Sequence, residues 1–190
     1  MSALKKIAEL FTVEEYLEDE KRREVRHEYV AGEVYAMAGA SRTHNTIAGN
    51  IYSVVKTALR GKGCQTFVEG VKVRIRTDHE TRFFYPDVFV TCDPRDTDDY
   101  FSDYPSIIFE VLSPDTKRLD EREKRWAYQT LESLHTYVLV DQFKQELTVW
   151  RRDLEGWGKS ETLPGPEAIL TIEDPSLTLP LSEIYAETGV

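Results

Sequence analysis

The sequence predicts an α/β protein in which a mixed β-sheet is flanked by helices. Two strongly apolar segments, residues 83–91 and 106–112, are typical of strands buried on both faces. Segments with helical periodicity lie around them, in the order helix, three strands, helix, strand. A chain of 190 residues suits one domain. We therefore expect a single domain over 1–190, with its core in 10–155 and a C-terminal extension in 156–190.

A short helix and a hairpin are expected before this core. Thr12 is a plausible N-cap, and Glu15 completes a capping box. Phe11 and Tyr16 can form the hydrophobic staple, so the helix should run to about Arg22. Short apolar segments then flank an Ala-Gly turn, which indicates a hairpin with strands at 27–30 and 33–37.

Residues 41–59 form the clearest predicted helix. Apolar side chains recur there at helical spacing, and Gly61 follows. His44 lies one turn before the first apolar residues of this face. It should therefore project inward near the start of the helix.

The rest of the chain alternates between strands and a helix. Residues 71–76 alternate apolar and basic side chains, which predicts a half-exposed strand. Between the two buried strands, residues 92–105 form a polar loop rich in Asp. The later expected elements are a helix from about 119 to 131, a strand at 135–140 paired with 146–151, short strands in the tail and a helical turn near Tyr185.

Composition limits the possible partners. The net charge is −10, from 24 basic and 34 acidic residues, which disfavours a protein that simply coats nucleic acid. Basic residues still cluster at 72–76 and 117–125, as a local groove or as a solvated charged face. No apolar segment approaches the roughly 20 residues of a membrane span, and the N-terminus lacks an apolar signal-peptide core. We expect a cytoplasmic protein without a membrane partner, with Cys64 and Cys92 as buried reduced thiols.

Two carboxylates lie inside the buried strands. Asp87 follows Pro86, and Glu110 lies in the middle of the second segment. A carboxylate is costly to bury unless it is paired or coordinates a cation. Mg²⁺ prefers oxygen ligands and usually takes one or two protein carboxylates, so this pair, with the carbonyl of Val111, indicates a metal site. Metal-assisted phosphodiester hydrolysis is the chemistry that such a site supports.

A lysine near the metal could orient the attacking water and stabilise the developing charge. Lys124 is the best candidate, because its helix face also carries Ala127 and Tyr128 and should turn toward the sheet. Asp120 lies one turn earlier on this face, as a helix-start residue or as a partner of Lys124. Lys72 is the second candidate lysine.

These residues resemble a known family. The resemblance covers about residues 10–155 and rests on the following segments and residues: Tyr85-Pro86-Asp87-Val88, Ile108-Phe109-Glu110-Val111-Leu112-Ser113-Pro114-Asp115-Thr116, Asp120, Lys124, Tyr128, His27 to Glu33, Met37, His44 and Tyr137 to Asp141. They look like the Uma-type family of putative restriction endonucleases, within the PD-(D/E)xK nuclease-like superfamily.

The resemblance implies a restriction-endonuclease-like αβββαβ core with a helix and hairpin added at its N-terminus. It also implies roles: Asp87 and Glu110 as metal ligands, Lys124 as the catalytic lysine, Glu28 as a further acidic contributor and His44 as a residue lining the site. One departure stands out. The superfamily places a lysine two residues after the glutamate, where this chain has Leu112.

The leading hypothesis is a homodimeric, Mg²⁺-dependent endonuclease acting on DNA, with Mn²⁺ as a possible substitute. The alternative is a catalytically silent module for nucleic-acid binding or assembly on a nuclease scaffold. Simpler roles also stay open: Asp87 as a strand-start residue, Glu110 as a partner of Arg74, Lys124 as a solvated lysine, Glu28 as a surface carboxylate and His44 as a satisfied polar residue. The three Trp residues, Trp126, Trp150 and Trp157, are expected in the core or at a dimer contact.

Overall fold

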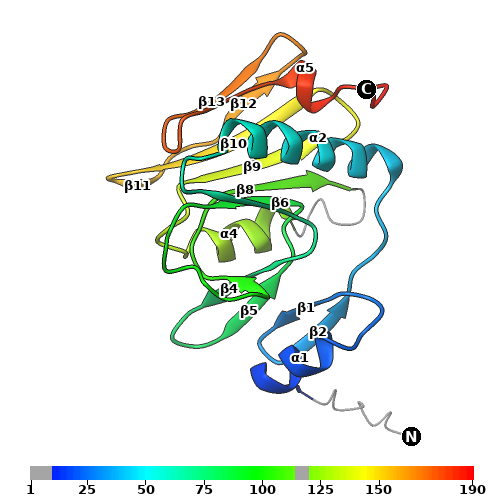
Figure 1. The fold of residues 1–190 in the computed structure, drawn as a ribbon, viewed down its shortest axis with the longest axis vertical. Helices are drawn as coiled ribbons and strands as arrows, with labels where there is room; N and C mark the ends of the chain where they lie inside the picture. Colours follow the sequence, from blue (N-terminus) through cyan, green and yellow to red (C-terminus); the bar gives the residue numbers. More distant parts are fainter. Residues whose placement is uncertain (1–9, 114–119) are drawn as a thin grey trace, which may run out of the picture.

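The computed structural model describes residues 10–113 and 120–190, apart from the side chains of residues 120 and 121, and shows a mixed α/β fold (Figure 1). Its first half contains α1 (Val13–Glu20), β1 (His27–Val30), β2 (Glu33–Ala36), α2 (Arg42–Ala58), β3 (Gln65–Val68), β4 (Lys72–Arg76), β5 (Thr81–Phe84), β6 (Val88–Thr91), β7 (Phe101–Ser102) and β8 (Pro105–Leu112). Its second half contains η1 (Asp120–Lys124), α4 (Arg125–Tyr128), β9 (Thr136–Asp141), β10 (Glu146–Asp153), β11 (Gly156–Trp157), β12 (Glu161–Pro164), β13 (Ile169–Ile172), β14 (Leu177–Pro180) and α5 (Leu181–Ile184).

The strands form a larger and a smaller sheet and a separate hairpin. The larger sheet has the order β11-β10-β9-β8-β6-β3, with β12 also paired to β10, and the smaller has the order β2-β1-β5-β4-β7. In the larger sheet, β8 pairs antiparallel with β6 and parallel with β9, so the sheet is mixed. Among the strands of residues 10–113 and 120–190, the last two, β13 and β14, pair only with each other.

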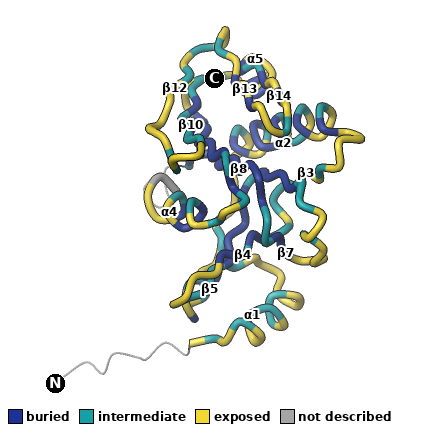
Figure 2. The backbone as a smooth tube through the Cα atoms, turned by 90° about the vertical axis from the view of Figure 1, so that its left-hand side faces the viewer, coloured by how far each residue is buried: buried dark blue, intermediate teal, exposed yellow. Residues whose placement is uncertain are grey.

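Apolar side chains cover both faces of the larger sheet. On one face, α2 and the C-terminal residues after β12 pack against Val88, Phe109 and Val138. On the other face, α4 and the smaller sheet pack against Phe89 and Ile108. Figure 2 shows this burial along β8 and β4, whereas most of α1 is of intermediate burial or exposed. The central strand β8 is therefore covered on both sides, as its continuous apolar sequence predicted.

The segment predicted as one strand over 83–91 is two strands in different sheets. β5 pairs with β4 and β1, whereas β6 pairs with β3 and β8. The break falls at Tyr85-Pro86-Asp87. Pro86 has no N–H to donate and restricts the backbone of the residue before it, which explains why neither ladder continues through this point.

Other boundaries also differ from the prediction. Residues 71–76 contain β4, which belongs to the smaller sheet, and the third strand of the main sheet is β3, which was not predicted. The loop over 92–105 contains β7, paired parallel with β4. The helix expected over 119–131 is shorter in the described residues, where η1 is a π-helical turn that continues into α4.

The N-terminal elements confirm their local signals. The Thr12 side chain accepts the Glu15 N–H at 3.2 Å, and the Glu15 carboxylate accepts the Thr12 N–H at 2.8 Å, which completes the capping box. The β1–β2 turn places Ala31 and Gly32 at φ of 50° and 98°. A helical turn, α5, precedes Tyr185 as expected. No helix of residues 10–113 or 120–190 has the length and apolar character needed to cross a bilayer.

The prediction of two reduced thiols is wrong. Cys64 and Cys92 form a disulfide with 4.1 Å between their Cα atoms. The reason is the β3–β6 register, which pairs Gln65 with Thr91 and so places the preceding and following cysteines opposite each other. The register was not visible in the sequence, because β3 itself was not predicted. The cytoplasmic location stays a prediction.

Candidate active site

Asp87 lies directly before β6, and Glu110 lies on the adjacent strand β8. The β6–β8 ladder ends at the pair of Val88 with Phe109, and Asp87 and Glu110 are the residues next to this pair in the two segments. Both carboxylates therefore come from the same end of the central strand pair, as the sequence predicted.

The Asp87 carboxylate binds the main chain and a histidine. Its Oδ2 accepts the Val111 N–H at 2.6 Å and lies 3.3 Å from His44 Nε2. His44 is held in the first turn of α2, where its own N–H donates to the Ser41 N-cap at 3.1 Å. Burial lowers the pKa of His44, but the hydrogen bond and charge of Asp87 outweigh this effect, and the pKa is raised overall. The buried His44 and the partly buried Asp87 thus form a pair at the start of β6.

Glu110 points to the opposite face of the sheet. It is 3 % exposed, and its Oε1 accepts a hydrogen bond from the Tyr128 hydroxyl at 3.1 Å. Complete burial, together with the charge of Glu110, raises the pKa of Tyr128 well above its usual value, so the hydroxyl remains a donor. The Lys124 amine lies 4.0 Å from the same Glu110 oxygen.

Lys124 is paired more closely with Glu28. Its amine lies 2.7 Å from Glu28 Oε1 and 5.5 Å from the centre of the Phe84 ring. The Tyr85 N–H also donates to Glu28 Oε1, at 3.4 Å. Both charged residues are buried. Three elements far apart in the sequence, β1, β8 and η1, therefore bring their charged side chains together on one face of the sheet.

The structure decides several of the simpler roles. Lys124 is not a solvated lysine, Glu28 is not a surface carboxylate, and Arg74 pairs with Asp103 at 2.5 Å rather than with Glu110. Asp87 does bond the backbone, as its simpler role required.

Other predicted positions lie outside this cluster. Lys72 is buried instead of half-exposed, and its amine donates to the Tyr85 hydroxyl at 3.4 Å. The side chain of Asp120 lies outside the described residues. Trp150 and Trp157 pack against the core, whereas Trp126 is exposed. Sequence reasoning gave no role to Tyr128, although its position one turn after Lys124 on the same helix face was visible.

The donor set is suited to Mg²⁺. Among the described residues, no three His, Cys, Asp or Glu side chains gather as a metal cluster would require. Mg²⁺ usually takes only one or two carboxylates and completes its shell with water, so this result does not conflict with the expected site. The Asp87 contacts above use Oδ2, and its side chain is 15 % exposed. Asp87, Glu110 and the Val111 carbonyl offer oxygen atoms of the kind that Mg²⁺ prefers, but the two carboxylates have their partners on opposite faces of the sheet.

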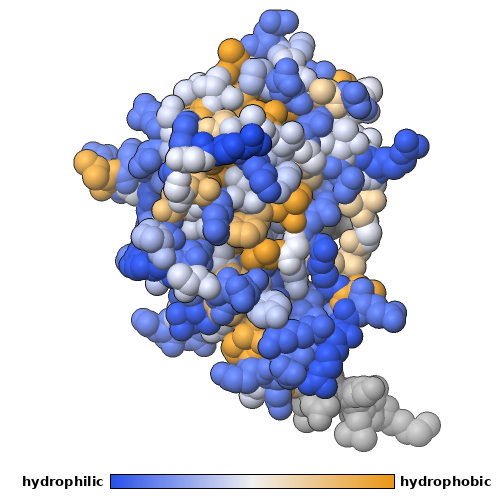
Figure 3. All heavy atoms as spheres, in the orientation of Figure 1, coloured by the Kyte–Doolittle hydropathy of each residue, from blue (hydrophilic) through white to orange (hydrophobic). Residues whose placement is uncertain are grey.

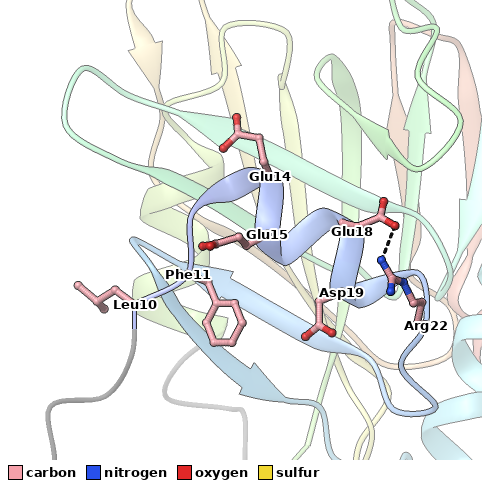
Figure 4. Close-up of a pocket in the computed structure, with 7 residues that line it drawn as sticks. All are labelled: Leu10, Phe11, Glu14, Glu15, Glu18, Asp19 and Arg22. Carbon is pink, nitrogen blue, oxygen red and sulfur yellow. Dashed lines mark hydrogen bonds and ion pairs between the residues drawn. The ribbon is translucent and has the colours of Figure 1, made fainter.

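A surface pocket lies elsewhere. It has a volume of about 720 Å³ and lies along α1, lined by Leu10, Phe11, Glu14, Glu15, Glu18, Asp19 and Arg22 (Figure 4). None of the site residues lines it. The face of the molecule in Figure 3 is mostly hydrophilic, with small hydrophobic areas scattered over it.

Comparison with known proteins places the chain in a family. The family model described as "Putative restriction endonuclease", Uma2, matches residues 13–182. The chain belongs to the Uma2 family. This match confirms the resemblance seen in the sequence, and it extends beyond residue 155 into the C-terminal strands.

Two similar proteins from Synechocystis sp. (strain ATCC 27184 / PCC 6803 / Kazusa) are described as uncharacterized. The protein slr1290 is 35% identical over 144 residues, which is 75% of each chain. The protein sll1609 is 32% identical over 137 residues, covering 70% of this chain and 76% of its own. They support the Uma2 assignment without adding an activity.

A solved structure has the same fold. It is the crystal structure of a protein from Anabaena variabilis ATCC 29413 described as a putative nuclease belonging to DUF820. The two share 18% sequence identity with a TM-score of 0.76, over 94% of this chain and 99% of that one. At this identity the match establishes the mixed α/β fold of the Uma2 protein.

Proposed function

We propose that this Uma2 protein is a Mg²⁺-dependent endonuclease that hydrolyses phosphodiester bonds of DNA. Asp87, Glu110 and the Val111 carbonyl would hold the metal, with Mn²⁺ as a substitute, and Lys124 would orient the attacking water. The single observation that carries the proposal is the burial of Glu110 with the Lys124 amine 4.0 Å from its Oε1, on the strand next to the one that Asp87 precedes.

The order of the elements supports this assignment. Along the chain, α2, β3, β6, β8, α4 and β9 follow the sequence helix, three strands, helix, strand, and the four strands are neighbours in the larger sheet. We assign this set as the restriction-endonuclease-like core. The smaller sheet and α1 are then additions, and they supply Glu28.

The missing lysine of the superfamily motif has a structural substitute. Leu112 lies two residues after Glu110 and packs in the core beneath α4. Lys124 comes from η1, the turn that leads into this helix, and its amine reaches the same face of β8. A cation can therefore act beside Glu110 although the strand itself carries none there.

Each group would have a separate task. When bound, the metal would neutralise charge that develops on the phosphate. The Lys124 amine would hold the water and stabilise the charged transition state by its fixed position. Glu28 keeps Lys124 in place at 2.7 Å, and Tyr128 fixes the orientation of Glu110 through its hydroxyl.

The test is cleavage by purified protein. Wild type with Mg²⁺ or Mn²⁺ should cut DNA, whereas Asp87→Asn, Glu110→Gln and Lys124→Met should each lose cleavage while remaining folded by circular dichroism. The matched control is Glu161→Gln, which changes an exposed carboxylate on β12. Absence of cleavage of single- and double-stranded DNA and RNA by wild type would overturn the proposal.

Two observations favour a catalytically silent module. The side chains of Asp87 and Glu110 have their partners on opposite faces of the larger sheet, His44 of α2 for Asp87 and Tyr128 of α4 for Glu110. The amine of Lys124 is already engaged at 2.7 Å by Glu28, as in a purely structural ion pair. In that case, wild type would bind DNA in a gel-shift experiment without cutting it.

Duplex cleavage needs two cuts, so the active protein should also sediment as a homodimer.

A further inference from the structure

A third buried carboxylate, in addition to Glu28 and Glu110, lies near the candidate site and has no role in the proposed reaction. Glu20, at the end of α1, has a side chain that is 4% exposed. Its Oε1 accepts the His27 N–H at 2.7 Å and the Tyr85 hydroxyl at 3.0 Å. Its Oε2 lies 3.2 Å from His27 Nδ1. Such complete satisfaction indicates that the carboxylate is held in one orientation.

A buried amine contacts the same tyrosine hydroxyl. Lys72 is 6% exposed, and its amine lies 3.4 Å from the Tyr85 hydroxyl and 5.2 Å from the centre of the ring. Burial lowers the pKa of Lys72, and the charge of Glu20 opposes this effect. Tyr85 therefore stands between an acidic and a basic side chain, and burial raises the pKa of its own hydroxyl.

Tyr85 also reaches the candidate site through its main chain. Its N–H donates to Glu28 Oε1 at 3.4 Å, the same oxygen that binds the Lys124 amine. The β1–β5 register, which pairs Tyr29 with Phe83, brings this part of β1 beside Tyr85. Pro86 and Asp87 follow directly in the sequence. One residue thus contacts Glu20 by its hydroxyl and Glu28 by its amide.

We propose that Tyr85 and Glu20 are positioning residues that keep Glu28 on Lys124. The proposal rests on the proposed function. Glu20 connects the end of α1 to the start of β1 through its contacts with His27. Its hydrogen bond with the Tyr85 hydroxyl connects these two elements to the segment that begins at Tyr85. Loss of this contact lets β1 shift relative to β5. Glu28 then no longer fixes the Lys124 amine, and turnover suffers while DNA binding does not.

The test uses two variants and one matched control. Tyr85→Phe removes only the hydroxyl, and Glu20→Gln keeps an acceptor but removes the charge. The control is Tyr29→Phe, which removes a buried hydroxyl on β1 that donates to the Phe11 carbonyl at 3.0 Å. We expect kcat for DNA cleavage to fall about tenfold in Tyr85→Phe, the effect of one hydrogen bond to a charged group. KM should stay within twofold, Glu20→Gln should lose less, and the control should keep both constants.

A second measurement does not depend on cleavage. Reductive methylation of the folded protein, followed by digestion and mass spectrometry of the peptide that contains Lys124, reports how firmly Glu28 holds the amine. The methylation rate should rise several-fold in Tyr85→Phe and stay at the wild-type value in Tyr29→Phe. If wild type cuts no nucleic acid, the proposed function fails, but methylation still tests the positioning. Equal methylation rates in Tyr85→Phe and Tyr29→Phe would overturn the positioning role.

Discussion

Lys124 and Glu28 form a buried ion pair, with 2.7 Å between the amine and Oε1. One partner comes from the N-terminal hairpin and the other from the turn that leads into α4. A buried charge that loses its partner destabilises a protein more than loss of the whole pair does. This asymmetry gives a direct test of the pair.

Removal of one partner should destabilise the fold. We expect Lys124→Met and Glu28→Gln each to reduce the free energy of unfolding, with about 3 kcal/mol for the lysine change, because it leaves a buried carboxylate without its cation. The double variant should lose less than the sum of the two single losses. Urea unfolding measures these values, and additive losses would show that the two side chains are not coupled.

The hydroxyl of Tyr128 should matter more than an ordinary buried hydroxyl. Tyr128→Phe removes a donor to the Glu110 carboxylate, and a hydrogen bond to a charged group contributes about 1.5–3 kcal/mol. Tyr29→Phe removes a donor to a neutral carbonyl, which should cost about 1 kcal/mol. Chemical denaturation of the two variants compares them. Equal losses of unfolding free energy would mean that the hydrogen bond to the Glu110 carboxylate stabilises the fold no more than one to a neutral carbonyl.

The disulfide should make stability depend on reductant. The Cys64–Cys92 bridge closes a loop with a sequence separation of 28, and the chain-entropy model gives about 3–4 kcal/mol for a loop of this size. Thermal unfolding of wild type should therefore shift to lower temperature when dithiothreitol is added. A Cys64→Ser/Cys92→Ser variant should unfold at the lower temperature in both conditions. An unchanged wild-type midpoint in reductant would contradict this expectation.

His135 should give the protein an acid-sensitive stability. Burial lowers its pKa below the usual 6.5, although the charge of Asp174 partly opposes the effect. In the window between the folded and unfolded pKa values the unfolded chain binds more protons, so stability rises with pH there. The contribution is present above pH 6.5 and is lost as pH falls through the folded pKa.

The matched measurement uses His135→Gln. Its free energy of unfolding should fall less than that of wild type between pH 7 and pH 5. His44 has a raised pKa, whose effect has the opposite sign, and it is the same in both proteins. Parallel pH profiles for the two proteins would rule out His135 as the acid-sensitive group.

Local signals predicted much of this fold. The Thr12 capping box, the long α2 and the apolar β8 depend on neighbouring residues, and the structure confirms each of them. The two carboxylates could be found because charged groups in apolar strands need a partner. Their strands prove to be neighbours in the expected order.

Long-range contacts account for what could not be predicted. The chain changes sheet at Pro86, and the register that joins Cys64 to Cys92 depends on β3, a strand of only 4 residues. The same limit applies to Lys72 and Glu20. Both side chains are buried around Tyr85 because α1 and β4 come together there in the folded protein. Sequence periodicity does not predict this contact between distant elements.

The wide spacing of the site residues along the chain has a consequence for synthesis. Glu28 and Asp87 leave the ribosome well before Lys124, and β8, which carries Glu110, needs β9 as its parallel neighbour. Before these segments are made, Glu28 and Glu110 lack the Lys124 amine, and the larger sheet is incomplete. A nascent chain, or a fragment that ends before η1, should therefore be harmless to DNA. Under the proposed function, cleavage would require a chain that extends at least through β9 (Thr136–Asp141).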